Sequence, residues 1–103
     1  MIYIDVDGVI ADFHGHMETL SDHPDLWTDD DVTHQVMDDN YKVCFLDAPE
    51  LPNCQFFIKL YKENPDNVKF LTAYGGFWSE PERCDTARMN KKMWLLQRGV
   101  RLY

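Results

Sequence analysis

The stretch YIDVDGVIADF, residues 3–13, decides the fold, because it places an apolar run directly before two carboxylates, Asp5 and Asp7. The β-branched and aromatic residues of this run predict a short buried strand over residues 1–6, and Gly8 ends it. A continuous apolar strand is typical of a sheet that is covered on both faces, as in α/β proteins. Acids at positions i and i+2 leave a strand on the same side, so both carboxylates are predicted to converge on one small site.

The rest of the chain alternates between helical and extended patterns. The expected elements are a helix over 9–20, an insert rich in Asp and His over 21–52, a helix over 53–63, a strand over 68–72, a helix over 80–98 closed by Gly99, and a strand from 100 onward. This order implies right-handed βαβ crossovers and an α/β fold with a Rossmann-like parallel sheet and flanking helices. Ligands of such sheets bind beyond the carboxyl ends of the strands, where Asp5, Asp7 and Thr72 all fall.

Two of the helices carry further expectations. In the insert, Thr28 followed by aspartates at 29–31 predicts an N-cap with acids in the first helical turn, and metal binding by this run is the less favoured alternative. In the last helix, the residues expected to face the core are Met89, Met93, Trp94 and Leu96.

The composition fits a single folded domain. The chain has 103 residues, of which 45% are hydrophobic and 14% aromatic, which is too apolar for a disordered chain. The formal net charge of -8 argues against binding to a nucleic-acid backbone, which needs clustered Lys and Arg. A phosphate ligand would need a cation or backbone amides to approach such a protein.

Cysteine usage and hydropathy bear on the compartment. Cys44, Cys54 and Cys84 form no CxxC pair, so neither a disulfide framework nor a zinc knuckle is expected. We interpret them as reduced thiols of a cytoplasmic protein. The first apolar run is too short for a signal peptide, and no later run approaches the roughly 20 residues of a membrane span, so no membrane contact is expected.

The paired carboxylates favour phosphate chemistry with a metal ion. Like charges this close are unfavourable unless a cation or a proton lies between them. Magnesium takes oxygen ligands and keeps waters that a substrate phosphate can displace, so it would resolve the conflict. One carboxylate can then attack phosphorus while the other handles protons.

Three segments carry a family resemblance. DVDGVIADF (5–13) resembles the first motif of the haloacid dehalogenase-like phosphohydrolases, and its DGVxADF form is similar to the 5'(3')-deoxyribonucleotidase branch. FLDAPELP (45–52) resembles the segment by which that branch returns from its helical cap. VKFLTAYG (68–75) resembles the second motif, an apolar strand that ends in Thr or Ser.

The resemblance implies a role for each matching residue. Asp5 would be the nucleophile that forms an aspartyl-phosphate, and it would also ligate Mg²⁺. Asp7 would protonate the leaving oxygen and then activate the hydrolytic water, while its backbone carbonyl contacts the metal. Thr72 would bind the phosphate through its hydroxyl, aided by backbone amides at Gly8 and Ala73. Residues 1–13 and 53–103 would form the α/β core, and 14–52 the cap over the site.

The sequence also departs from the family pattern. The branch usually has a serine where this chain has Ala73. The lysine of the third motif and the acidic pair of the fourth are expected after the strand that begins at Val100, and the sequence ends at Tyr103. Lys91 and Lys92, in the preceding helix, are the less favoured substitutes for that lysine.

The missing fourth-motif strand has a structural consequence. In the family fold it pairs beside the first strand, so the edge of residues 2–6 would be open, which is an aggregation risk that native chains usually cover. We therefore expect a partner chain, or a second copy in a homodimer, at this edge.

Aromatic residues suggest a surface for a nucleotide base, and Phe13, Phe45 and Tyr74 are the expected pocket; Trp27, Tyr41, Phe77 and Trp78 are further candidates. An EF-hand interpretation of residues 5–16 fails, because the loop positions that need an oxygen ligand, glycine and glutamate hold Val9, Ile10 and His16. His14 and His16 as transition-metal ligands are a weaker alternative.

Two classes of function remain open. The first is a magnesium-dependent phosphomonoesterase acting on a small phosphorylated substrate, with a 5'-nucleotidase for (deoxy)nucleoside monophosphates as the favoured activity. The second is a shortened, catalytically weak relative that binds a nucleotide, a metal or a partner chain without turnover.

Overall fold

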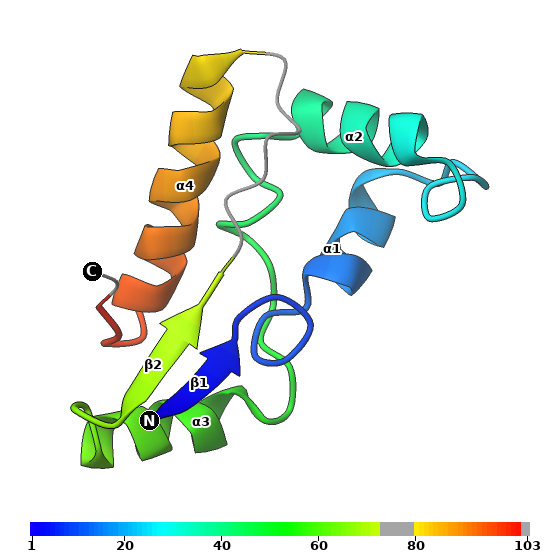
Figure 1. The fold of residues 1–103 in the computed structure, drawn as a ribbon. Helices are drawn as coiled ribbons and strands as arrows, with labels where there is room; N and C mark the ends of the chain where they lie inside the picture. Colours follow the sequence, from blue (N-terminus) through cyan, green and yellow to red (C-terminus); the bar gives the residue numbers. More distant parts are fainter. Residues whose placement is uncertain (73–79, 102–103) are drawn as a thin grey trace.

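The computed structural model of the chain describes residues 1–72 and 80–101 (Figure 1). In this part of the chain the elements are, in order, β1 (Ile2–Asp5), α1 (Phe13–Leu20), α2 (Asp30–Asp39), α3 (Cys54–Glu63), β2 (Val68–Leu71) and α4 (Pro81–Leu96). The predicted α/β class is confirmed, and the larger Rossmann-like sheet stays a prediction. The expectations for Ala73, Tyr74, Phe77 and Trp78, and for a strand that reaches Tyr103, lie outside the described residues.

The strands β1 and β2 pair in parallel, with the register running from Ile2 opposite Val68 to Asp5 opposite Leu71. Parallel strands require a long crossover, which is supplied here by α3 and by residues 14–52, which are called the insert from here on. In the described residues β1 pairs only with β2. The expected partner chain or second copy at the other edge of β1 stays a prediction.

One face of the sheet is buried. Ile4 and Phe70 are opposite each other in the register and belong to one core cluster with Ile58 of α3 and Trp94 of α4. Side chains alternate between the faces of a strand, and Tyr3, which points to the opposite face, is exposed. In the described residues α3 and α4 therefore cover one face of the sheet, and the expected cover on both faces is not found there.

The chain folds back on itself between β1 and α1. Gly8 has φ +82°, a left-handed conformation that costs other residues energy because of their Cβ. The amide of Ile10 then donates to the carbonyl of Val6 at 3.1 Å. The helix expected over 9–20 therefore begins only at Phe13, because the preceding residues form this turn.

The helix N-cap predicted in the insert is confirmed, with a shift of one residue. Asp29 rather than Thr28 is the N-cap of α2, and its carboxylate accepts from the amide of Asp31 at 3.0 Å. Asp30 and Asp31 occupy the first turn, where the helix dipole favours negative charge. The Thr28 hydroxyl instead faces Asp25, at 3.4 Å.

The prediction for the buried face of α4 was wrong for three of its four residues. Met89, Met93 and Leu96 are exposed, and only Trp94 lies in the core. The residues of α4 that are buried are Ala87, Lys91, Trp94 and Leu95. Apolar side chains occupy two faces of this helix, so spacing alone could not show which face packs against the rest of the protein. The end of the helix was predicted well, because Gly99 follows it with φ +80° and donates to the carbonyl of Leu96.

In Figure 1, helix α4 begins at the level of α2 and extends to the level of the sheet. At its start, Arg83 pairs with Asp38 of α2 at 2.8 Å. Just beyond its end, Arg98 pairs with Glu50, in the segment that returns from the insert, at 2.9 Å. α4 also contributes to two separate core clusters, one around the sheet and one inside the insert.

None of the described helices is long and apolar enough to cross a membrane.

Candidate active site

The carboxyl ends of the two strands bring together residues that are far apart in the sequence. Asp5 is the last residue of β1, Asp7 lies two residues beyond it, and Thr72 directly follows β2. The Thr72 hydroxyl donates to Oδ2 of Asp7 at 3.3 Å. The parallel pairing of β1 and β2 produces this contact, because it places both strand ends at the same edge of the sheet.

A buried lysine completes this group. Nζ of Lys91, on α4, lies 3.2 Å from Oδ2 of Asp7, and the lysine side chain is only 6% exposed while that of Asp7 is 30% exposed. The sequence indicated Lys91 only as a less favoured substitute for the lysine of the third motif. The spacing of Ala87, Lys91, Trp94 and Leu95 places the lysine on one face of α4 with three apolar residues, but only the structure shows that this face is the buried one.

One aromatic ring of the predicted pocket lies next to this lysine, and a second ring stacks on the first. Nζ of Lys91 is 4.1 Å from the centroid of the Phe45 ring. The rings of Phe45 and Phe13 stack at 4.8 Å with an interplanar angle of 19°. Phe45 is buried at 6% exposure, so its contacts in this structure are with protein groups. Base stacking by Phe13 and Phe45 stays a prediction, and the third expected pocket residue, Tyr74, is outside the described residues.

Asp5 differs from Asp7 in its surroundings. Asp5 is exposed, and its carboxylate has no ion-pair or hydrogen-bond partner among the residues that the structure describes. Asp7, in contrast, is contacted at Oδ2 by both Thr72 and Lys91. An uncompensated carboxylate is free to act as a nucleophile, whereas a carboxylate held at one oxygen is oriented for proton transfer at the other.

The third acid of the opening stretch has a structural role. Oδ1 of Asp12 accepts from the amide of Gly15 at 2.9 Å, so Asp12 is the N-cap of α1. Its side-chain oxygen satisfies an amide that the helix itself leaves unpaired.

The space between Asp7 and Lys91 is small. A cavity of about 10 Å³, close to the volume that one water molecule needs, is lined by Val6, Asp7, Ala11, Phe45, Ala48, Lys91 and Trp94. Cys44 is buried nearby in the insert core. Burial raises the pKa of its thiol to about 12, and the charge of Lys91 acts in the opposite direction. The thiol is therefore protonated at neutral pH and is not a nucleophile.

The site could bind magnesium only with water or substrate oxygens as most of the ligands. Within residues 1–72 and 80–101, no three His, Cys, Asp or Glu side chains gather in a way that could hold a metal ion. Magnesium, however, is commonly bound through one or two carboxylates, with waters and substrate phosphate as the other ligands. Asp5 and Asp7 supply two carboxylates at the end of β1 for such binding, and Mg²⁺ remains a proposal.

The histidines that the sequence offered as metal ligands have other partners. His14 stacks on Trp27 at 4.0 Å and pairs with Glu18 at 3.0 Å. Nε2 of His16 lies 3.0 Å from the carbonyl of Val43. All three contacts lie within the insert, and the two rings have different partners.

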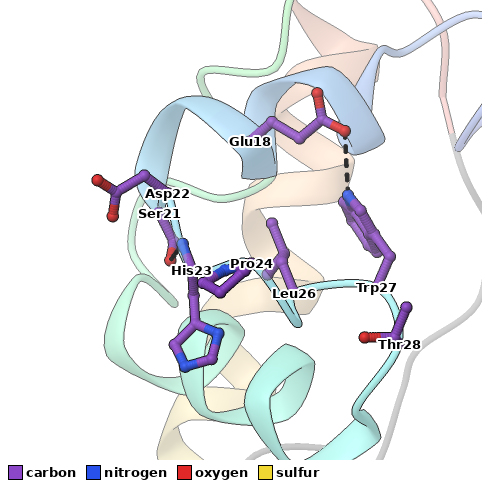
Figure 2. Close-up of a pocket in the computed structure, with 8 residues that line it drawn as sticks. All are labelled: Glu18, Ser21, Asp22, His23, Pro24, Leu26, Trp27 and Thr28. Atoms are coloured by element: carbon purple, nitrogen blue, oxygen red, sulfur yellow. Dashed lines mark hydrogen bonds between the residues drawn. The ribbon is translucent and has the colours of Figure 1, made fainter.

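A larger surface hollow lies in the insert, at the end of α1 that is remote from Asp12. It has a volume of about 390 Å³ and is lined by Glu18, Ser21, Asp22, His23, Pro24, Leu26, Trp27 and Thr28. Figure 2 shows the Glu18 carboxylate pointing toward the indole of Trp27, which donates to it at 3.1 Å. None of the residues around this hollow belongs to the group at Asp7.

Comparisons with known proteins add no relative to this description. No protein-family model matches the sequence, and a search of curated proteins finds no significant match. The functional argument therefore rests on the site itself.

Proposed function

We propose that the protein is a magnesium-dependent phosphomonoesterase of the haloacid dehalogenase-like type, and that its substrates are nucleoside monophosphates. The observation that carries the proposal is the convergence of Asp7, Thr72 and Lys91 at the carboxyl ends of two parallel strands. The carboxylate can transfer protons, the hydroxyl is a neutral hydrogen-bond donor, and the ammonium supplies positive charge. These are the groups that phosphoryl transfer needs in addition to a nucleophile.

Substrate binding would use Lys91 and Thr72. A phosphate beside Asp7 receives a charge-assisted hydrogen bond from the Lys91 ammonium and a second bond from the Thr72 hydroxyl. The protein carries a net charge of -8, so a buried cation at the site offsets repulsion between the chain and an anionic substrate. Magnesium, when held by Asp5 and Asp7, would neutralise further charge on the phosphate.

The chemistry would proceed in two displacements. Asp5 attacks phosphorus, the bond to the ester oxygen breaks, and Asp7, which enters this step protonated at the oxygen that Lys91 does not contact, gives that proton to the leaving oxygen. Asp7 then takes a proton from water, the water oxygen attacks phosphorus, and the bond between phosphorus and Asp5 breaks to release phosphate. When a phosphate takes the hydrogen bond of the Thr72 hydroxyl, the Lys91 ammonium, which has three N–H donors, still holds Oδ2 of Asp7 and leaves the other oxygen for both proton transfers.

The experiment compares variants of two aspartates, one at the end of β1 and one at the N-cap of α1. Phosphate release from a panel of nucleoside and sugar monophosphates is measured with Mg²⁺ for the wild type, Asp5→Asn and Asp12→Asn. Asp12→Asn is the matched control, because it removes the same charge while asparagine keeps the helix cap. We expect release by the wild type and Asp12→Asn, and a loss of at least about 10³-fold for Asp5→Asn.

Two outcomes would contradict the proposal. Turnover by Asp5→Asn at the wild-type rate would exclude Asp5 as the nucleophile. No turnover by the wild type, together with a heat of binding for Mg²⁺ or a nucleotide in titration calorimetry, would support the alternative of a binding protein without catalysis.

A further inference from the structure

We propose that Phe45, which belongs to the insert, is a positioning residue for Lys91. Its ring lies 4.1 Å from the Lys91 ammonium, which is itself 3.2 Å from the Asp7 carboxylate. The part that this placement plays in catalysis rests on the proposed function. The placement itself is a separate statement about two side chains, and it can be tested without turnover.

The physical basis is the burial of the lysine. An ammonium that is 6% exposed has lost most of its hydration, and the lost hydration must be replaced by protein groups. Asp7 replaces part of it on one side. The negative face of an aromatic ring within about 6 Å attracts a cation, and the attraction is strongest where water is excluded. Phe45 is buried to the same degree as Lys91, so it meets this condition.

Helix α4 holds the segment that carries Phe45 at two points. Nδ2 of Asn90 donates to the carbonyl of Lys42 at 2.9 Å, and Nε1 of Trp94 donates to the carbonyl of Ala48 at 2.7 Å. Asn90 directly precedes Lys91 in the sequence and Trp94 lies one helical turn beyond Asn90. The helix that supplies the ammonium thus also fixes the backbone on both sides of the ring. Phe13 then packs against Phe45 at 4.8 Å.

This arrangement has a consequence for the insert. An insert that only covered the site would affect access of substrate and water, whereas Phe45 makes it part of the electrostatic environment of the phosphate-binding cation. Movement of residues 42–48 away from α4 would remove the Phe45 ring from Lys91, so the ammonium would be less well oriented. The ring therefore couples the position of the insert to the position of the charge.

The test measures the chemical reactivity of the Lys91 amine. Intact protein is acetylated with trace acetic anhydride, and mass spectrometry gives the labelling of Lys91 relative to Lys59, whose side chain is 77% exposed. The variants are Phe45→Met, which removes the ring and fills its space, Phe45→Tyr, which keeps a ring, and Phe13→Met. Phe13→Met is the matched control because it disturbs the same aromatic stack without removing the ring that faces Lys91.

We expect the labelling ratio to rise about fivefold in Phe45→Met and to stay near the wild-type value in Phe45→Tyr and Phe13→Met. Equal labelling of Phe45→Met and the wild type would overturn the proposal, and so would an equal rise in Phe13→Met, which would indicate general loosening. Thermal melting followed by circular dichroism checks folding, and Phe45→Leu replaces Phe45→Met if that variant is unfolded at the labelling temperature.

Activity supplies a second and separable result. If the wild type releases phosphate, Phe45→Met should lower kcat about tenfold and Phe45→Tyr should restore most of it. If the wild type has no phosphatase activity, the proposed function fails while the labelling ratios still decide whether Phe45 positions Lys91.

Discussion

At the scale of single residues, the site depends on the difference between Asp5 and Asp7. The exposed Asp5 carboxylate has no polar side-chain partner in the described part of the chain, whereas Asp7 is held by Thr72 and Lys91. The spacing of the two acids predicts a shared site but not this division. It arises because Asp7 lies just beyond β1, where the amide of Val6 still donates to the carbonyl of Leu71 and so keeps Asp7 beside the end of β2.

Burial of the Cys44 thiol predicts a specific pH dependence of stability. Burial raises its pKa from 9.0 to about 12, so the folded thiol keeps its proton while the unfolded thiol loses it above pH 9.0. The unfolded state then binds fewer protons, and the free energy of unfolding falls as the pH rises from 9.0 to about 12. Urea unfolding of the wild type and Cys44→Ala, at pH values on both sides of 9.0, measures this. The free energy of unfolding should fall less with rising pH in Cys44→Ala than in the wild type. Equal falls would show that burial of the Cys44 thiol does not cause the pH dependence.

At the scale of elements, α4 determines how the insert and the sheet meet. Along the helix, Arg83 contacts Asp38 of α2, and Lys91 contacts both Phe45 and Asp7. Just beyond its end, Arg98 contacts Glu50. Its bounds could be predicted, because Pro81 begins it and Gly99 follows its end. Its buried face could not be predicted, because that choice depends on which side chains the insert and the sheet present to it.

The ion pair between α4 and α2 is expected to contribute measurably to stability. Arg83 and Asp38 lie 2.8 Å apart and are 30 and 15% exposed, so solvent screens them only in part. A double-mutant cycle with Arg83→Ala and Asp38→Ala, measured by urea unfolding, should give a coupling of about 1 kcal/mol. The matched control is the exposed pair Lys59 and Glu63, 3.9 Å apart on α3, for which we expect at most about 0.3 kcal/mol. Equal coupling energies for the two pairs would show that partial burial does not strengthen the ion pair between α4 and α2.

At the scale of the whole molecule, two core clusters meet at a polar site. One cluster surrounds the sheet and the other lies within the insert, and α4 supplies residues to both. Lys91 is the only buried charged side chain among the described residues, and it lies between Ala87 of the insert core and Trp94 of the sheet core. A buried charge at such a junction is more readily explained by function than by stability.

Replacement of this lysine should separate stability from activity. In Lys91→Met, an apolar side chain of similar length fills the same space, and Asp7 can be hydrated because it is 30% exposed. We expect the free energy of unfolding, from urea titration, to stay within about 1 kcal/mol of the wild type. Phosphate release should fall at least about 10²-fold. Destabilisation by about 3 kcal/mol or more would instead show that the ion pair is chiefly structural.

The sequence by itself determined the local elements and the position of the paired acids. An apolar run with β-branched residues forms a strand in many contexts, and Gly8, Asp29 and Gly99 act through their own backbone or nearest neighbours. Only the tertiary structure decided that Lys91 and Phe45 lie beside Asp7. Both placements depend on which face α4 turns toward the insert, and this is set by the packing of residues that are distant along the chain. The opening stretch thus carries the carboxylates, and the packing of α4 provides the charge that balances one of them.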